Sequence, residues 1–209
     1  MKKISYVGNA GSACALACYT MAAQYLLPKK DITFEKLAEL TDWKKDYVVW
    51  GFRVWKYLMD LGIHIVDYDT IDYDAWSKNG VDGLKKSVPP QDFEYYKKNT
   101  YSIEDEAKYI KGALGHENFT YVRRKPTWDD VFREFAKPGV IDLTLDLSKL
   151  NNSKEFEAHR VVIVDISDKE VVFNDPDNNW QGENRAEPLT DFRQLFEAMD
   201  APELARYYL

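Results

Sequence analysis

A cysteine, a histidine and an aspartate in this chain are placed where a helix start and two neighbouring strands can bring them together. Cys14 opens the stretch CALACYTMAAQYLL, in which apolar side chains recur at helical spacing. Free backbone N–H groups at a helix start favour a thiolate and lower the thiol pKa. His159 can accept and return a proton near neutral pH. Asp175 can fix the orientation of the histidine ring, which completes the parts of a nucleophilic cysteine centre.

The segments around His159 and Asp175 predict a hairpin that holds both residues at one end. Residues 160–166 contain the apolar run 161–164 and predict a strand, and residues 170–174 predict its partner. The intervening Ser-Asp-Lys is a turn sequence. With so short a turn, His159 and Asp175 come to the same end of the two strands, and a rigid sheet edge can hold a base against a helix terminus.

The rest of the chain predicts helices first and antiparallel strands last, which is an α+β plan in one domain. Helices are expected over 14–26, about 34–40, 52–61, 102–113, 127–136 and 189–199, and strands over 63–66, 140–147, 160–166, 170–174 and 206–209. The strict alternation from Ile141 onward is typical of a half-buried strand. Residues 67 to about 100 are expected to form an insertion or irregular surface helices, long enough to cap a cleft.

Several polar residues are candidates for helix caps. Ser12 and Thr33 precede two of the expected helices. Capping boxes are predicted where Ser102 is followed by Asp105 and where Thr127 is followed by Asp130.

The segments around the three residues resemble the bacteriocin-processing branch of the papain-like cysteine peptidases and its stand-alone relatives. In that branch the catalytic Cys opens a helix, with a Met seven residues on and often a Tyr eleven on; here these are Met21 and Tyr25. Its His begins an apolar strand and its Asp follows in an Asn-Asp-Pro turn, as in EAHRVVIVDISDKEVVFNDP. The resemblance covers residues 1–26 and about 120–180. It implies a papain-like fold, an N-terminal helical layer on a C-terminal antiparallel sheet, with Cys14, His159 and Asp175 as the catalytic triad.

The same resemblance marks where an oxyanion would be held. The family places a Gln six residues before the Cys, where this chain has Gly8, and Asn9 is the nearest amide. The family also has Gly-Pro after the Cys, where this chain has Ala15 and Leu16. We therefore expect the backbone N–H of Cys14 and, with a shifted loop, the side chain of Asn9 to form the oxyanion hole.

Three functions remain open on this pattern. The first is a cysteine hydrolase that cleaves an amide bond, with a peptide or acyl-amide as substrate and no cofactor. The second is an acyltransferase that uses the same triad and an amine as acceptor. The third is a binding module that has kept the fold and lost the activity, which the missing Gln favours.

Other candidate residues favour plainer interpretations. Cys18 is expected to be a core residue, His64 a core or edge residue, and His116 a residue just past a helix end. A metal site built from Cys14, Cys18 and a histidine lacks the second ligand pair of a zinc site. The acidic residues between 67 and 74 lack the pattern of a calcium loop and are expected in a solvated loop.

Charge, apolar content and cysteine count limit the partners and the cellular compartment that we expect. The formal net charge is -7 and no basic run occurs, so nucleic acid is a poor partner. No stretch approaches the ~20 apolar residues of a membrane-spanning helix, and no apolar core of a signal peptide follows the first residues. Two cysteines are too few for a disulfide framework. We expect free thiols and a cytoplasmic protein, while its oligomeric state is left open.

Overall fold

The computed structural model describes residues 1–9, 11–146, 158–177 and 182–209. Within these residues the helices are α1 (Cys14–Leu26), α2 (Phe34–Thr41), α3 (Phe52–Asp60), α4 (Tyr73–Asn79), α5 (Val81–Ser87), α6 (Pro90–Asn99), α7 (Ile103–Leu114), α8 (Trp128–Phe135) and α9 (Leu189–Glu197). The strands are β1 (His64–Asp69), β2 (Phe119–Arg123), β3 (Val140–Asp146), β4 (Ala158–Ile166), β5 (Glu170–Asn174), β6 (Arg185–Pro188) and β7 (Leu204–Tyr208). The expected end of the third strand at Leu147 lies outside the described residues.

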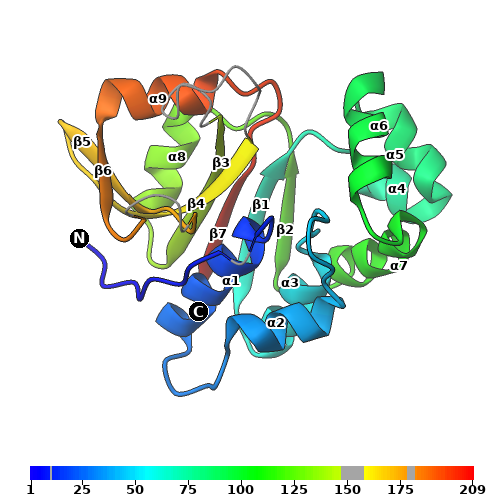
Figure 1. The fold of residues 1–209 in the computed structure, drawn as a ribbon, viewed down its shortest axis with the longest axis horizontal. Coiled ribbons are helices and arrows are strands. Elements are labelled where there is room, and N and C mark those ends of the chain that lie inside the picture. Colours follow the sequence, from blue (N-terminus) through cyan, green and yellow to red (C-terminus); the bar gives the residue numbers. More distant parts are fainter. Residues whose placement is uncertain (10, 147–157, 178–181) are drawn as a thin grey trace.

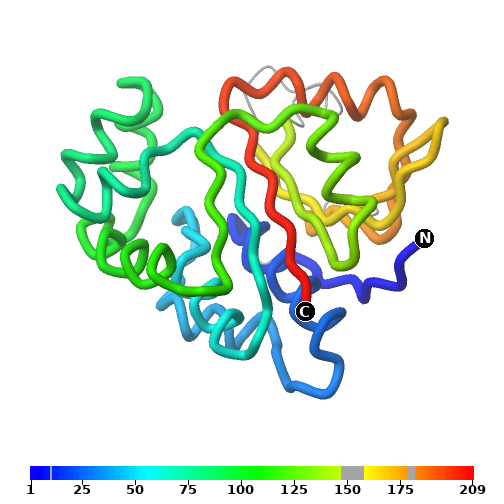
Figure 2. The backbone as a smooth tube through the Cα atoms, turned by 180° about the vertical axis from the view of Figure 1, so that it is seen from behind, coloured from blue at the N-terminus to red at the C-terminus, as the bar shows by residue number. Residues whose placement is uncertain are grey.

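The strands form one mixed sheet in the order β2-β1-β7-β3-β4-β5-β6. The predicted α+β class is confirmed, but the expected sheet of late, antiparallel strands is wrong in one half. β1 and β2 come from the middle of the chain and pair in parallel. The C-terminal strand β7 joins the halves because it pairs antiparallel with both β1 and β3. Figure 2 shows this strand in red between the two halves.

Helices cover both faces of the sheet, so the molecule has three layers (Figure 1). Helices α1 to α3 pack in one hydrophobic cluster with one face, and α8 and α9 pack in a second cluster with the other. This arrangement explains why β3 is buried on both faces, whereas its alternating sequence predicted a half-buried strand. Its polar positions, Asp142 and Thr144, face inward as well.

Those inward polar groups are satisfied by a buried network beneath α1. Asp142 accepts a hydrogen bond from Arg160 Nη1 at 2.6 Å and another from the hydroxyl of Tyr207 at 2.9 Å. Arg160 also forms an ion pair with Glu203, and its guanidinium lies 5.7 Å from the ring centroid of Tyr19 on α1. A buried charge is tolerated only when it is paired in this way. The network therefore fixes α1 over β3 and β4.

The segment after residue 66 differs from its expectation. Asp67 and Asp69, which were expected in a solvated loop, are buried in β1. The alternation of acidic and aromatic residues there is that of a strand, so the shorter strand prediction was wrong. Three regular helices, α4, α5 and α6, make up most of the segment and group with α7 beside the sheet (Figure 1).

Two of the predicted caps are confirmed and two are wrong. The Thr33 side chain accepts from Lys36 N–H, and Thr127 and Asp130 form the expected capping box. Ser102 has a left-handed backbone and makes no side-chain cap. Ser12 does not cap α1, because the N-cap position is Ala13.

We predict that Gly139→Ala destabilises the protein more than Gly62→Ala. Both glycines have positive φ, at +117° and +94°, so a side chain strains either backbone by roughly 1–3 kcal/mol. Only at Gly139 would the new Cβ stand 2.1 Å from the carbonyl oxygen of Tyr207, which β7 cannot move without losing its pairing to β3. Denaturant unfolding should show an extra loss of about 1–3 kcal/mol for Gly139→Ala. Equal losses would contradict this tight contact.

Candidate active site

Cys14 is the first residue of α1, where the sequence predicted it. The helix start is held from outside by Asn9, whose Oδ1 accepts a hydrogen bond from the backbone N–H of Ala13 at 2.9 Å. This side-chain oxygen, four residues before Ala13, thus makes the hydrogen bond at the helix start that was expected from Ser12. The first N–H groups of a helix have no partner within it, so the start of α1 favours negative charge at Cys14.

His159 and Asp175 are brought together as predicted. The Nε2 of His159 lies 2.7 Å from Oδ1 of Asp175, and both side chains are almost fully buried. The strand register places Val162 opposite Asn174, so both residues lie at the same end of the β4–β5 pair. A hydrogen bond at this distance between buried groups fixes the imidazole ring and leaves Nδ1 as the nitrogen that faces Cys14.

The carboxylate of Asp175 is held from several sides. Its Oδ2 accepts from Arg185 Nη1 at 3.0 Å, and its Oδ1 also accepts from the backbone N–H of Asp177 at 3.0 Å. Burial raises the pKa of Asp175, but the hydrogen bond and charge of His159 outweigh burial and lower it. Asp175 is therefore an ionised acceptor for the histidine.

Charges around Cys14 favour the thiolate. Burial alone would raise the pKa of the Cys14 thiol, but the hydrogen bond and positive charge of His159 outweigh burial. A backbone hydrogen bond from Arg160 and the charge of its guanidinium act in the same direction, so the pKa of Cys14 lies below its ordinary value. These are the surroundings of a reactive cysteine rather than of a core thiol.

The pKa of His159 shifts in the direction that favours the charged imidazolium. Burial lowers the pKa of His159, but the hydrogen bond to Asp175 and the contacts with Cys14 raise it to about 10. The lowered pKa of Cys14 and the raised pKa of His159 therefore both favour a thiolate–imidazolium pair. Each charge stabilises the other, so the loss of one group changes the pKa of its partner.

Two arginines complete this environment, and the sequence interpretation did not single them out. Arg160 interrupts an apolar strand directly after His159, and a charge in such a strand is a signal of a buried ion pair. Arg185 opens β6, a strand that was not predicted, and its pairing with Asp175 follows only from the β5–β6 register. No spacing in the sequence points to Arg185.

The segment before Cys14 is tied to the turn after Asp175. The backbone N–H of Asn9 donates to the carbonyl oxygen of Pro176 at 2.5 Å. The buried Asn174 amide donates to the carbonyl oxygen of Ile4 at 3.3 Å and accepts from the backbone N–H of Asn184 at 2.9 Å. The Asn-Asp-Pro turn therefore positions the N-terminal segment as well as the acid of the triad. Asn9 itself lies beside the helix start that bears the thiol.

Helix α6 faces the same centre. The pKa of Tyr95 is raised by burial and by the negative charge of Cys14, which places this tyrosine within electrostatic range of the thiolate. Tyr95 is more than half exposed and neighbours Tyr96, whose ring lies 4.9 Å from that of Trp50. The segment between residues 67 and 100 thus brings Tyr95 near the site.

The remaining candidate residues lie away from the centre. Cys18 is fully buried and its thiol donates to the carbonyl oxygen of Arg160 at 3.3 Å, while burial raises its pKa. His64 stacks on Tyr208 at the start of β1. His116 follows the end of α7, where its Nδ1 accepts from the backbone N–H of Asn118. These positions confirm the expected roles, and both thiols are free.

Comparisons with known proteins leave the assignment to the geometry. Neither the models of protein families, nor the curated proteins, nor the solved structures contain a match to this chain. Within the described part of the chain, no three metal-ligating side chains gather in one place. No helix among the described residues is long and apolar enough to cross a membrane.

We predict that Cys14 is alkylated rapidly at neutral pH and Cys18 is not. The pKa of Cys14 lies below its ordinary value, so its thiolate persists to lower pH than that of an ordinary thiol and is lost only as the pH falls through that lowered value. At pH 7 the rate with iodoacetamide should exceed that of Cys18 at least about tenfold. Mass spectrometry of the modified peptides measures both rates across pH 5 to 10.

The His159→Ala variant supplies the matched test of the ion pair. Without the imidazolium, burial dominates, so the pKa of Cys14 should rise and its rate at pH 7 should approach that of Cys18. His64→Ala is the control, since His64 stacks on Tyr208 and lies outside the pair. An unchanged Cys14 profile in His159→Ala would show that the pair is not what activates the thiol.

Proposed function

We propose that this protein is a papain-like cysteine hydrolase that cleaves an amide bond in a peptide or acyl-amide substrate. The observation that carries the proposal is the buried 2.7 Å contact between His159 Nε2 and Asp175 Oδ1 beside a thiol at the start of α1. The lowered pKa of Cys14 and the raised pKa of His159 support it, because a hydrolase of this kind needs a thiolate and a proton donor before the substrate arrives.

The charges on these residues suit each step of the reaction. The Sγ of Cys14 attacks the carbonyl carbon and forms a C–S bond, while the carbonyl oxygen takes the negative charge. The imidazolium of His159 gives its Nδ1 proton to the amide nitrogen as the C–N bond breaks and the amine leaves. His159, now neutral, takes a proton from water as the water oxygen attacks the thioester carbon. The C–S bond then breaks, the carboxylic acid leaves, and Cys14 is again a thiolate beside the protonated His159. Asp175 holds the ring in the same orientation through both halves.

The oxyanion needs donors at the start of α1. The backbone N–H of Cys14 is the first of these, because the opening N–H groups of a helix have no partner within the helix. Asn9 is the second, through its Nδ2, since its Oδ1 already accepts from Ala13. This assignment gives one side chain two uses: its oxygen orders the helix start and its nitrogen binds the oxyanion.

Turnover of an unbiased peptide mixture tests the proposed function. We expect new peptide termini when the protein is incubated with a peptide library at pH 7, and a covalent thioester on Cys14 at short times. Cys14→Ala should abolish both, and Asp175→Asn should reduce turnover by several orders of magnitude, as removing the acid of a triad does. Mass spectrometry detects the products. Cleavage that persists in Cys14→Ala would contradict the proposed function.

A separate substitution tests the oxyanion role of Asn9. We expect Asn9→Ala to lower turnover by ~10²–10³ while leaving the alkylation rate of Cys14 within about threefold of the unaltered protein. Alkylation needs the thiolate but no oxyanion, so the two readouts separate the roles. Parallel loss of both rates would mean that Asn9 only orders the helix start.

A further inference from the structure

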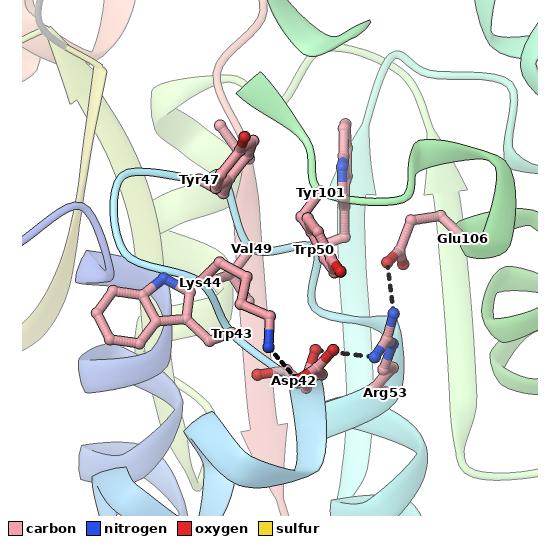
Figure 3. A pocket seen from close by; sticks show the side chains of 11 residues that line it. Asp42, Trp43, Lys44, Tyr47, Val49, Trp50, Arg53, Tyr101 and Glu106 are labelled. Atoms are coloured by element: carbon pink, nitrogen blue, oxygen red, sulfur yellow. Dashed lines mark hydrogen bonds and ion pairs between the residues drawn. The ribbon is translucent and has the colours of Figure 1, made fainter. Parts of the chain in front are cut away.

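A pocket beside the candidate active site contains a buried carboxylate with an unused oxygen. The pocket is lined by the segment between α2 and α3, the start of α3, and residues around the start of α7. Its lining includes Tyr47, Trp50, Arg53, Tyr101 and Glu106, and Figure 3 shows the carboxylate of Glu106 pointing toward Arg53 with Trp50 and Tyr101 beside it. Nothing in the triad chemistry uses this group.

Glu106 is only half satisfied. Its Oε1 accepts from Arg53 Nη2 at 3.3 Å, a long contact for a charged pair, and its Oε2 has no hydrogen-bond partner among the described residues although the side chain is more than nine-tenths buried. Arg53 is shared, because its Nη1 donates to the carbonyl oxygen of Thr41 at 2.8 Å and its guanidinium lies 4.0 Å from the ring centroid of Tyr109. A buried acceptor left in this state favours a ligand that brings a donor.

Aromatic rings form the outer wall of the pocket. Tyr47 and Tyr101 meet edge to face at 5.7 Å and are both exposed, and Trp50 is fixed by a hydrogen bond to Thr100. The ammonium of Lys44 lies 5.5 Å from the ring centroid of Tyr101, which is cation–π range. The wall thus already accepts one ammonium group on its rim, and Lys44 is itself balanced by Asp42.

We propose that this pocket binds a primary ammonium group, and specifically a lysine side chain of the substrate. One unused carboxylate oxygen matches a single-point donor such as an ammonium, whereas a guanidinium binds best to both oxygens of a carboxylate at once. The aromatic wall suits both the aliphatic stem and the positive head of such a side chain. The proposal rests on the proposed function, because it assigns the occupant of a subsite of that hydrolase.

Two contacts connect the segments that line the pocket with segments of the candidate centre. A Cβ placed on Gly11, just before Cys14, would lie 3.9 Å from the side chain of Lys45, so the segment between α2 and α3 reaches the start of α1. On the other side the ring of Trp50 contacts Tyr96, the neighbour of Tyr95. A peptide bound at the thiol can therefore place one side chain against this wall.

The charges facing Glu106 predict how binding responds to pH. Arg53 from α3, Asp105 and Lys108 from its own helix, and the Asp42–Lys44 pair across the pocket are the charged groups nearby. Burial outweighs the charge of Arg53 and raises the pKa of Glu106 to about 7. An ammonium ligand needs the ionised form, so its affinity should fall as the pH drops from 8 to 6.

Binding of n-butylammonium tests the pocket without any need for turnover. We expect n-butylammonium to shift the indole N–H resonance of Trp50 in the Cys14→Ala protein, with 1-butanol shifting it far less. Affinity should fall at least tenfold in Glu106→Gln and in Tyr101→Leu. It should remain unchanged in Glu104→Gln, because Glu104 is an exposed residue on the same helix. Equal shifts from the amine and the alcohol, or equal affinities in all variants, would overturn the proposal.

Two further measurements distinguish a failure of the pocket from misfolding and from a failure of the proposed function. Tyr101 is nearly half exposed, so its replacement keeps the test valid even where Glu106→Gln fails to fold, and thermal unfolding identifies that case. Matched peptides with lysine or norleucine at each position then measure kcat/KM in the active protein. Ammonium binding without any hydrolysis would remove the proposed function and leave the pocket, whereas hydrolysis with no preference for lysine would remove the subsite and leave the hydrolase.

Discussion

The candidate centre depends on one buried hydrogen bond, between His159 and Asp175 at the shared end of β4 and β5. It fixes the ring, and the ring in turn stabilises the Cys14 thiolate by hydrogen bonding and by charge. His159 and Asp175 are nearly buried, where an unpaired charge would cost several kcal/mol, and Cys14 is partly buried. The three groups are therefore interdependent, and loss of one partner leaves the other two with the wrong charge for the chemistry.

The surrounding structure serves to keep this geometry. Arg185 and the backbone of Asp177 hold the carboxylate, while the Asn174 amide and the Asn9–Pro176 hydrogen bond tie the N-terminal segment to the same turn. Beneath α1, the pairing of Arg160 with Asp142 places a second positive charge near the thiol. The strand register, the hydrogen bonds of the N-terminal segment and the buried ion pairs thus together position the groups around the start of α1.

The carboxylate in the pocket around Glu106 is less completely hydrogen-bonded than the groups of the triad. There the chain leaves a buried oxygen without a partner, and an arginine that could satisfy it is divided among several contacts. Fully paired groups at the triad suit rigid chemistry, whereas an incompletely paired group beside it suits recognition of a molecule from outside. The helices that the sequence marked as an insertion contribute Tyr95 and Tyr96 between these two places.

The sequence by itself determined the local features: the helix that Cys14 opens, the β4–β5 hairpin with His159 and Asp175 at one end, and the caps at Thr33 and Thr127. These follow from short-range periodicity and turn chemistry, which neighbouring residues fix. Only the tertiary structure decided that β1 pairs in parallel with β2 and that Asp67 and Asp142 are buried. It also decided that Arg185 pairs with Asp175 and that Glu106 pairs with Arg53. Such contacts join residues far apart in the chain, and no local spacing encodes which strand becomes central or which charge finds a distant partner.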